Sequence, residues 1–307
     1  MPALAYDFTK FKIYKNINID NVIIPTTDDV AWEFFPSDRW IYNKLDLSEI
    51  NKIPCGPAGT YPNKYPVVVK PMMNLFSGGY GSRKIDTKEE LEKYLLPGYF
   101  WMKWLKGTHL SYDIVVKDGN PVWIETFQGH KLRDGMFDYW ETISSEVSSE
   151  QINKIVDWTT SHLPEYTGCL CCETINDQMI EAHLRMGDID RFMNLDLMQN
   201  IVNIYKGKEW QYFEGYKKFF LFALFAPYNQ EIVFDSKILK KIKHESIFFQ
   251  LDRNTTLLCN PPSGKRIAIL GAYDRTLCID LRNLLINNAQ PTIMNEYVGS
   301  LLGYKNT

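Results

Sequence analysis

Hydrophobic and polar positions along this 307-residue chain follow two spacings, one helical and one extended. The helical spacing predicts helices in six segments: 37–50, 87–96, 149–162, 194–205, 212–225 and 276–287. Short apolar or alternating runs predict strands at 20–26, 67–70, 99–105, 110–117, 121–127, 168–184 and 265–271. Because hairpins fall between helices, the pattern predicts an α+β (mixed α/β) fold and argues against a doubly wound parallel sheet.

The segment 168–184 is predicted to be a hairpin whose register follows from its apolar positions. A three-residue loop, 176–178, sets Glu173 opposite Glu181. The apolar side chains then share one face: Leu170, Cys172, Ile180, Ala182 and Leu184. The other face carries Glu173, Glu181, His183 and Arg185. A two-residue loop would shift the pairing by one and turn Glu181 and His183 toward the apolar side.

Facing glutamates at this position predict a cation site. Carboxylates about 5 Å apart across two strands repel by about 3 kcal/mol at an effective dielectric constant of about 20. A bound cation removes that repulsion, and Mg²⁺ takes one or two carboxylates together with substrate phosphates. The alternative is an exposed hairpin whose carboxylates pair with nearby lysines.

A second segment has the residue types of a phosphate site. Lys70 ends the apolar run 67–69, and a turn with Gly78, Gly79, Gly81 and Ser82 follows, with Arg83 and Lys84 behind it. Glycines let backbone N–H groups approach an anion closely. The glycine spacing is that of neither a Walker loop nor a dinucleotide fingerprint, and the His-Arg-Asp and Asp-Phe-Gly tripeptides of protein kinases do not occur. The alternative is an exposed loop with solvated charges.

Composition excludes several classes of partner. The net charge is −3, from 34 basic and 37 acidic residues, so no electrostatic footprint for nucleic acid or an anionic membrane is visible. The N-terminus lacks the pattern of a signal peptide, and the most apolar run, 219–226, is too short to span a bilayer. Six cysteines without metal-ligand spacing fit a reducing compartment, and we expect a cytoplasmic protein with Cys169, Cys171 and Cys172 in its core.

Joined in this order, the two segments resemble the ATP-grasp superfamily, from about Asp38 to Arg185. The resemblance implies two α+β subdomains clasping ATP. It divides the chain into an N-terminal region 1–62, a small subdomain 63–106 with the glycine loop, and a large subdomain 107–307 with the metal hairpin and a C-terminal extension. It also implies a ligase that activates a carboxylate as an acyl phosphate for attack by an amine or thiol.

The resemblance assigns roles to individual residues. The set implied to hold the nucleotide is Lys44, Lys70, Gly78, Gly79, Gly81, Ser82, Lys103, Trp104, Leu105 and His109. Glu173, Glu181 and His183 match the ligands of Mg²⁺, with Mn²⁺ as an alternative, and Arg185 and Lys70 match the catalytic positions. Three residues depart from the family pattern. Met102 stands in place of an acidic residue, His109 in place of a ribose-binding glutamate, and His183 in place of an asparagine.

The co-substrate pocket is expected just after the strand 121–127, where Gln128, His130 and Arg133 stand. Arg133 could clamp a substrate carboxylate, and a solvated surface loop is the alternative. Two other functions remain open, a small-molecule kinase of the same fold and a nucleotide-binding protein without catalysis. The expected partners are small-molecule acids and amines or thiols, without nucleic acid or membrane; a homodimer stays open.

Overall fold

A computed structural model of the chain describes residues 3–4, 17, 19, 22–75, 79, 81–133, 136–187, 195–213, 217–227, 230–251 and 265–293. Its centre is an eight-stranded sheet in which every neighbouring pair is antiparallel. In sheet order the strands are β11 (Gln178–His183), β10 (Gly168–Ile175), β7 (His109–Lys117), β8 (Asn120–Arg133), β9 (Met136–Thr142), β12 (Phe220–Ala226), β15 (Lys265–Ala272) and β14 (Phe248–Leu251).

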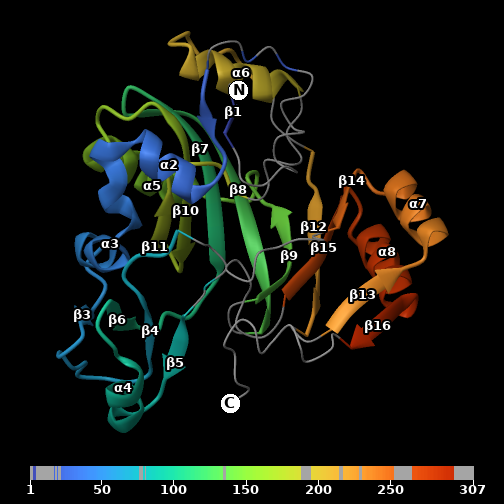
Figure 1. Cartoon of the computed structure of the whole chain (residues 1–307). Coiled ribbons are helices and arrows are strands. Elements are labelled where there is room, and N and C mark those ends of the chain that lie inside the picture. The colour runs from blue at the N-terminus through green and yellow to red at the C-terminus, as the bar shows by residue number, and fades with distance from the viewer. Residues whose placement is uncertain are drawn as a thin grey trace.

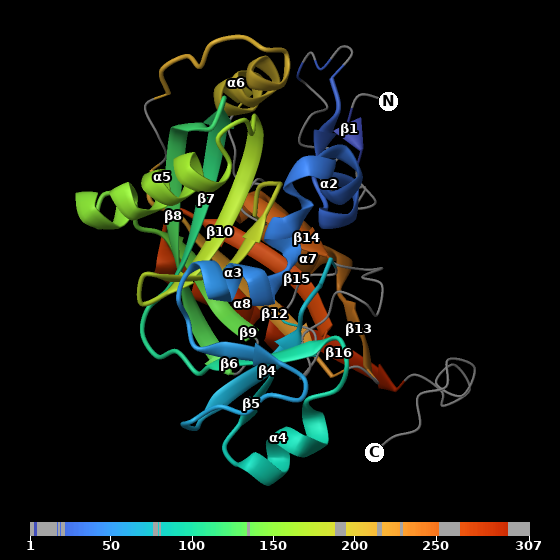
Figure 2. The same cartoon turned by 90° about the vertical axis from the view of Figure 1, so that its left-hand side faces the viewer.

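A four-stranded antiparallel sheet lies beside the β11 end of the large sheet (Figures 1 and 2). Its strands, in order, are β3 (Cys55–Pro57), β6 (Tyr99–Lys103), β4 (Val67–Pro71) and β5 (Arg83–Ile85), and α4 (Lys88–Tyr94) packs on it. An apolar cluster that includes Phe100 and Met102 from this sheet and Ile180 from β11 joins the two sheets. The pairing of β3 with β6 hydrogen-bonds residues 55–57 to this small sheet.

Helices cover one face of the large sheet, which we call the helix face. At one end α2 (Asp28–Phe34), η2 (Pro36–Tyr42), α3 (Lys44–Ile50) and α5 (Ser149–His162) bury the side chains of β7, β10 and β11. At the other end α7 (Ser236–Glu245) and α8 (Arg275–Asn287) pack on β12 and β15, as Figure 1 shows on the right. Two small pairs complete the fold, β1 (Ala3–Leu4) with β2 (Ile24–Pro25) and β13 (Gln230–Phe234) with β16 (Ala289–Ile293).

The opposite face, which we call the site face, is covered differently along its length. α6 (Leu195–Tyr205) and β2 pack over the end that carries Val115 and Cys169. Toward the small sheet, the same face carries Glu173 and Glu181. The site-face positions are therefore split between a packed apolar end and a polar end.

Most predicted elements are confirmed, and one is wrong. The helices over 149–162, 194–205 and 276–287 and the two predicted hairpins are present. The segment 212–225, expected to be a helix, instead supplies strand β12. Leu221 and Phe222 point to opposite faces of the sheet and both are buried, so the strand is apolar on both sides and lacks the alternation that marks a half-exposed strand. Within the described residues, no helix is long and apolar enough to cross a membrane.

Candidate active site

The hairpin β10–β11 places two glutamates opposite each other. Glu173 pairs with Glu181, which confirms the predicted register. The loop, however, has two residues, not three. Asn176 and Asp177 both adopt positive φ (50° and 62°), the geometry of a tight hairpin turn. An irregularity between Glu173 and Thr174 then admits Ile180 as an extra residue, and this bulge restores the register that a two-residue loop alone would lose.

Two lysines from different elements reach this pair. The ammonium of Lys44, at the start of α3, forms a salt bridge with Oε1 of Glu181. Lys70, at the end of β4, donates to the carbonyl of Ile180 at 3.2 Å. Both side chains are buried. Burial and the nearby Lys44 lower the pKa of Lys70 to about 8, although Glu181 and Glu173 oppose that shift. An anion bound beside Lys70 would therefore stabilise the charged form of this side chain.

A buried carboxylate from the N-terminal part of the chain holds the far end of the hairpin. Asp28, in the first turn of α2, lies 2.9 Å from Nδ1 of His183 and 2.7 Å from a terminal nitrogen of Arg185. Burial alone would raise the pKa of Asp28, but Arg185 and His183 outweigh it and hold that pKa well below its ordinary value. Sequence reasoning missed Asp28, which lies outside the stretch that resembles a known family.

The charge of His183 follows from these neighbours. Burial lowers the pKa of His183, but Asp28 and a contact of 3.4 Å between Nε2 and Oε1 of Glu181 raise it to about 9, against an opposing effect of Arg185. Glu181 stays ionised in the same network. Burial opposes its charge, yet Lys44, His183 and Lys70 together hold its pKa well below the ordinary value.

His109, the first residue of β7, contacts the other glutamate. Its Nε2 lies 2.8 Å from Oε2 of Glu173. The ring is buried against the edges of Phe137 and Trp140. Nδ1 is buried and has no hydrogen-bond partner among the described residues. His109 therefore contacts Glu173 with one nitrogen, while the other is enclosed within the protein.

Part of the expected glycine loop, Gly79, Gly81 and Ser82, lies within the described residues, as does the linker 103–105. Gly79 and Gly81 have φ of 64° and 76°, which favours glycine, and the N–H of Ser82 closes the turn on the carbonyl of Gly79 at 3.0 Å. Gly78 lies outside the described residues. In the linker, the N–H groups of Lys103 and Trp104 donate to the carbonyls of Pro54 and Pro66, so these two amides are already used.

Comparison with solved structures finds similar folds in several enzymes. An L-amino acid ligase from Bacillus licheniformis is similar over 84% of this chain and 73% of its own, with a TM-score of 0.57 and 14% identity. A carboxyaminoimidazole ribonucleotide synthase from Aspergillus clavatus, complexed with ATP, matches 92% of this chain and 79% of its own, with a TM-score of 0.60 and 10% identity. The biotin carboxylase domain of a 2-oxoglutarate carboxylase from Hydrogenobacter thermophilus, which holds MgADP, matches 95% and 75%, with a TM-score of 0.54 and 12% identity.

The chain has the ATP-grasp fold. No family model matches the sequence, and no curated protein sequence matches it. The likeness is therefore carried by the arrangement of strands and helices. At identities between 10% and 16% it concerns the fold alone.

The residues present fit a metal ion that is shared with a nucleotide. In the described part of the chain, no cluster of three His, Cys, Asp or Glu side chains could hold a metal ion by itself. Two facing glutamates with lysines beside them match a site that Mg²⁺ completes with phosphate oxygens. His183, expected as the third ligand, does not suit that role while it is protonated, because an imidazolium has no lone pair to donate.

Two of the three co-substrate residues expected from the sequence, Gln128 and His130, lie on the helix face of the large sheet. Paired residues of antiparallel strands share a face, and Glu173 pairs with Ser111, which pairs with Phe127. Gln128 and His130 therefore point to the helix face, away from Glu173. His130 contacts Glu141 at 2.7 Å and stacks on Tyr139 there. The strand runs on to Arg133, whose side chain lies outside the described residues.

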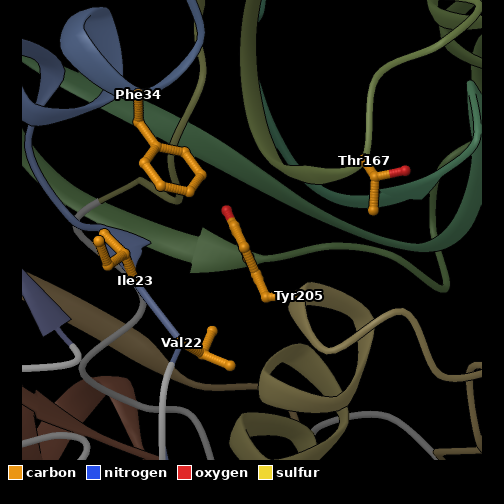
Figure 3. A pocket seen from close by; sticks show the side chains of 5 residues that line it. All are labelled: Val22, Ile23, Phe34, Thr167 and Tyr205. Atoms are coloured by element: carbon orange, nitrogen blue, oxygen red, sulfur yellow. The ribbon is translucent and has the colours of Figure 1, made fainter.

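A cavity of about 430 Å³ is lined by five residues that Figure 3 shows as sticks. The residues that line it are Val22, Ile23, Phe34, Thr167 and Tyr205. The hydroxyl oxygens of Tyr205 and Thr167 already accept hydrogen bonds from the amides of Cys169 and Asp118. None of the five belongs to the glutamate site, so this cavity is separate from the candidate active site.

Proposed function

We propose that this chain is an ATP- and Mg²⁺-dependent ligase that activates a carboxylate as an acyl phosphate for attack by an amine or a thiol. The observation that carries the proposal is the meeting of two buried lysines, from α3 and β4, with two facing glutamates on one hairpin. Enzyme neighbours such as the L-amino acid ligase support it by their shared fold.

The lysines and the glycine loop are the proposed phosphate site. Lys44 is paired with Glu181, so a bound phosphate would compete with that carboxylate for its ammonium. Lys70 has no such salt bridge among the described residues and is buried, which makes an arriving anion more favourable there than in water. The amides of Gly79 and Gly81 would add uncharged donors.

Glu173 and Glu181 are the residues we propose to hold the metal. When bound, Mg²⁺ would neutralise charge that develops on the phosphate oxygens. His109 and His183 each contact one of these glutamates, at 2.8 Å and 3.4 Å, and would hold its carboxylate in position for the ion. This assigns His183 to positioning Glu181 and not to binding the ion.

The proposed reaction has two steps. A carboxylate oxygen of the acid attacks the γ-phosphorus of ATP, the bond to the bridging oxygen breaks, and ADP leaves. The amine nitrogen, or thiol sulfur, then attacks the acyl carbon. The acyl carbon–oxygen bond breaks, inorganic phosphate leaves with the electron pair, and the proton of the nucleophile passes to the leaving phosphate. Arg185 and Lys70 would stabilise the negative charge that accumulates at the transferred group.

The nucleotide site is tested by thermal unfolding. A non-hydrolysable ATP analogue with Mg²⁺ should raise the Tm of the wild type by about 5 °C at saturation, and less without Mg²⁺. Lys70→Ala should abolish the rise, whereas Lys64→Ala, an exposed lysine in the preceding loop, should keep it. An equal rise in both variants, or none in the wild type, would refute the proposed site.

The reaction type is tested by phosphate release. A ligase releases inorganic phosphate from ATP only when an acid and a nucleophile are both present. A panel of acids, each with and without a panel of amines and thiols, should therefore show release for particular pairs. Transfer of phosphate to a single co-substrate without release would assign the site to a kinase.

A further inference from the structure

The charges of this chain are unevenly distributed along it. Residues 217–307 include 12 basic and 7 acidic residues, whereas residues 1–216 include 22 basic and 30 acidic residues. The net charge of −3 therefore combines a positive C-terminal part with a strongly negative remainder. Salt screens charges beyond about 8 Å at physiological ionic strength, so a partner at the surface meets the local charge and not the sum.

Helix α7 carries a group of unpaired positive charges. Four of its ten residues are lysines, and all four are exposed. Lys241 lies 3.9 Å from Glu245, but Lys237, Lys240 and Lys243 form no salt bridge within the described residues. We call these three the basic group. Their spacing of three residues places them on one side of the helix, where like charges repel. The apolar stripe of α7 packs against α8, so the lysines face outward.

A second group of charges lies where η2, the end of α5 and the turn between β7 and β8 meet. It consists of Asp38, Asp118 and Glu165, which we call the acidic group. The turn is held to the segment after α5, because the N–H of Gly119 donates to the carbonyl of Tyr166 at 2.9 Å. Burial and the nearby Glu165 raise the pKa of Asp38, so a cation beside this pair would be favourable. None of the three carboxylates forms a salt bridge with another described residue.

The two groups are too far apart to neutralise each other within one molecule. α7 packs on β14, and the acidic group lies at the end of β7, five strands away in the sheet. At about 4.8 Å per strand this separation is about 24 Å, three times the screening distance. Figure 1 shows α7 on the right and α2 and α5 on the left. Each group can therefore pair with the opposite charge only in another molecule.

Exposed apolar side chains accompany both groups. Phe34, 41% exposed, lines the cavity of Figure 3 together with Thr167, whose hydroxyl accepts a hydrogen bond from the amide of Asp118. Ile247 and Tyr273 are 49% and 55% exposed and lie just beyond α7, where β14 begins and β15 ends. A contact between these two surfaces would combine apolar packing with charge pairing, as stable protein interfaces do.

We propose that the basic group and the acidic group are the two halves of one interface, and that the partner is a second copy of this chain. Each copy offers both halves. In a two-fold arrangement the α7 of each copy meets the acidic group of the other, so the contact is made twice and closes at two chains. Tyr273 of one copy packs against the partner's Phe34. The interface is independent of the proposed ligase reaction.

The interface is tested by sedimentation velocity of the whole protein without nucleotide. The wild type should be a dimer in about 20 mM NaCl, and about 500 mM NaCl should raise the Kd of the dimer at least about tenfold, because salt screens exposed ion pairs. Changing all three lysines of the basic group to glutamate should give a monomer in both salts. A matched control changes three exposed lysines around the small sheet to glutamate: Lys64, Lys88 and Lys93. It alters the net charge equally and should keep the dimer.

A charge exchange decides whether the two groups meet each other. Changing Asp38, Asp118 and Glu165 to lysine should also give a monomer. Neither triple variant can pair with itself, because both of its groups then carry the same sign. Mixed in equal amounts, the two variants should form a heterodimer, since each reversed group now meets its opposite charge. Circular dichroism and the Tm of each variant show whether it is folded.

The apolar part of the interface has its own test, which holds even where a triple variant fails to fold. Tyr273→Ser should raise the Kd of the dimer at least about fivefold. Tyr61→Ser, at a tyrosine near the small sheet that is 52% exposed, should leave the Kd unchanged.

Four results would overturn the interface. The first is a wild type that stays monomeric in low salt, and the second is a dimer that a folded variant of the basic group retains. The third is a pair of folded triple variants that remain monomers when mixed, and the fourth is an equal effect of the two tyrosine substitutions. Retention of a monomeric wild type on immobilised heparin, lost when the basic group is reversed, would assign α7 to a polyanion instead of a second copy.

Discussion

The carboxylate of Asp28 lies 2.9 Å from Nδ1 of His183, across 155 residues of sequence. Its other oxygen lies 2.7 Å from Arg185. One side chain from helix α2 thus bonds to two residues of the segment that ends the glutamate hairpin. Because His183 in turn contacts Glu181, the N-terminal helix fixes the position of a proposed metal ligand through a single intermediate residue.

Asp28→Asn should destabilise the protein by about 3–5 kcal/mol, because it leaves two buried cations without their counter-charge. Chemical denaturation measures the loss. Asp29→Asn, the next residue in the same helix and only half-buried, is the control and should cost less than about 1 kcal/mol. The double variant Asp28→Asn, His183→Asn should recover part of the loss, since it removes one of the two stranded cations. Equal effects of the two single substitutions would contradict the central role of Asp28.

The pairing of the two glutamates could be predicted from sequence, but the means of achieving it could not. The apolar pattern placed Leu170, Cys172, Ile180, Ala182 and Leu184 on one face, and so paired Glu173 with Glu181. Four of them share one buried cluster, whereas Ile180 packs against the small sheet. The short turn and the bulge at Ile180 compensate each other. The two-residue turn and the bulge shift the register by one residue in opposite directions, so the shifts cancel. The pattern of apolar positions therefore predicts neither of them.

Other parts of the site depend on contacts that a linear pattern does not contain. Asp28 can be buried because His183 and Arg185 compensate its charge. Both partners are more than 150 residues away in the sequence, so the residues around Asp28 give no sign of the pairing. Gln128 and His130 were placed near the site because they follow a predicted strand. The strand continues through both of them, so the alternation of faces turns them toward the helices.

Stability should fall as the pH rises from about 4.5 to about 7 because of Glu125. Burial, together with the nearby Asp113, raises the pKa of this carboxyl to about 7 from 4.5, although hydrogen bonds from Ser144 and the backbone oppose the rise. A group whose pKa is higher in the folded state stabilises the fold fully below its unfolded pKa, and that contribution disappears as the pH passes its folded pKa.

The loss amounts to about 3 kcal/mol at most, and Glu125→Gln should abolish this part of the pH dependence. Urea denaturation at intervals between pH 4.5 and pH 7.5 compares the two proteins. Glu146→Gln, at an exposed glutamate, serves as the control and should retain the wild-type slope. A variant at Glu125 that follows the wild-type curve would show that this carboxyl is not the source.

Gly119→Ala should destabilise the hairpin β7–β8 by about 2–4 kcal/mol. Gly119 has a φ of 75°, and a Cβ there would lie 2.3 Å from the carbonyl oxygen of Pro164. Gly207→Ala is a matched control, because Gly207 has a φ of 72° and nothing within 4 Å of the added Cβ. The control should lose only the conformational part, about 1 kcal/mol. Similar losses in the two variants would mean that the loop at Pro164 yields to the new methyl group.

Glu181→Gln should separate nucleotide binding from metal binding. The substitution removes the charge that pairs with Lys44 and lies near His183, so an anionic nucleotide alone should bind at least as well as to the wild type. The proposed Mg²⁺ site would lose one of its two carboxylates, and the Mg²⁺-dependent part of the Tm rise should disappear. Titration of the ATP analogue with and without Mg²⁺ measures both effects.

Glu150→Gln, at a side chain that is 80% exposed on α5, should behave like the wild type. A Glu181→Gln variant with full Mg²⁺ dependence would exclude Glu181 as a ligand and leave Glu173 as the only candidate carboxylate of the pair.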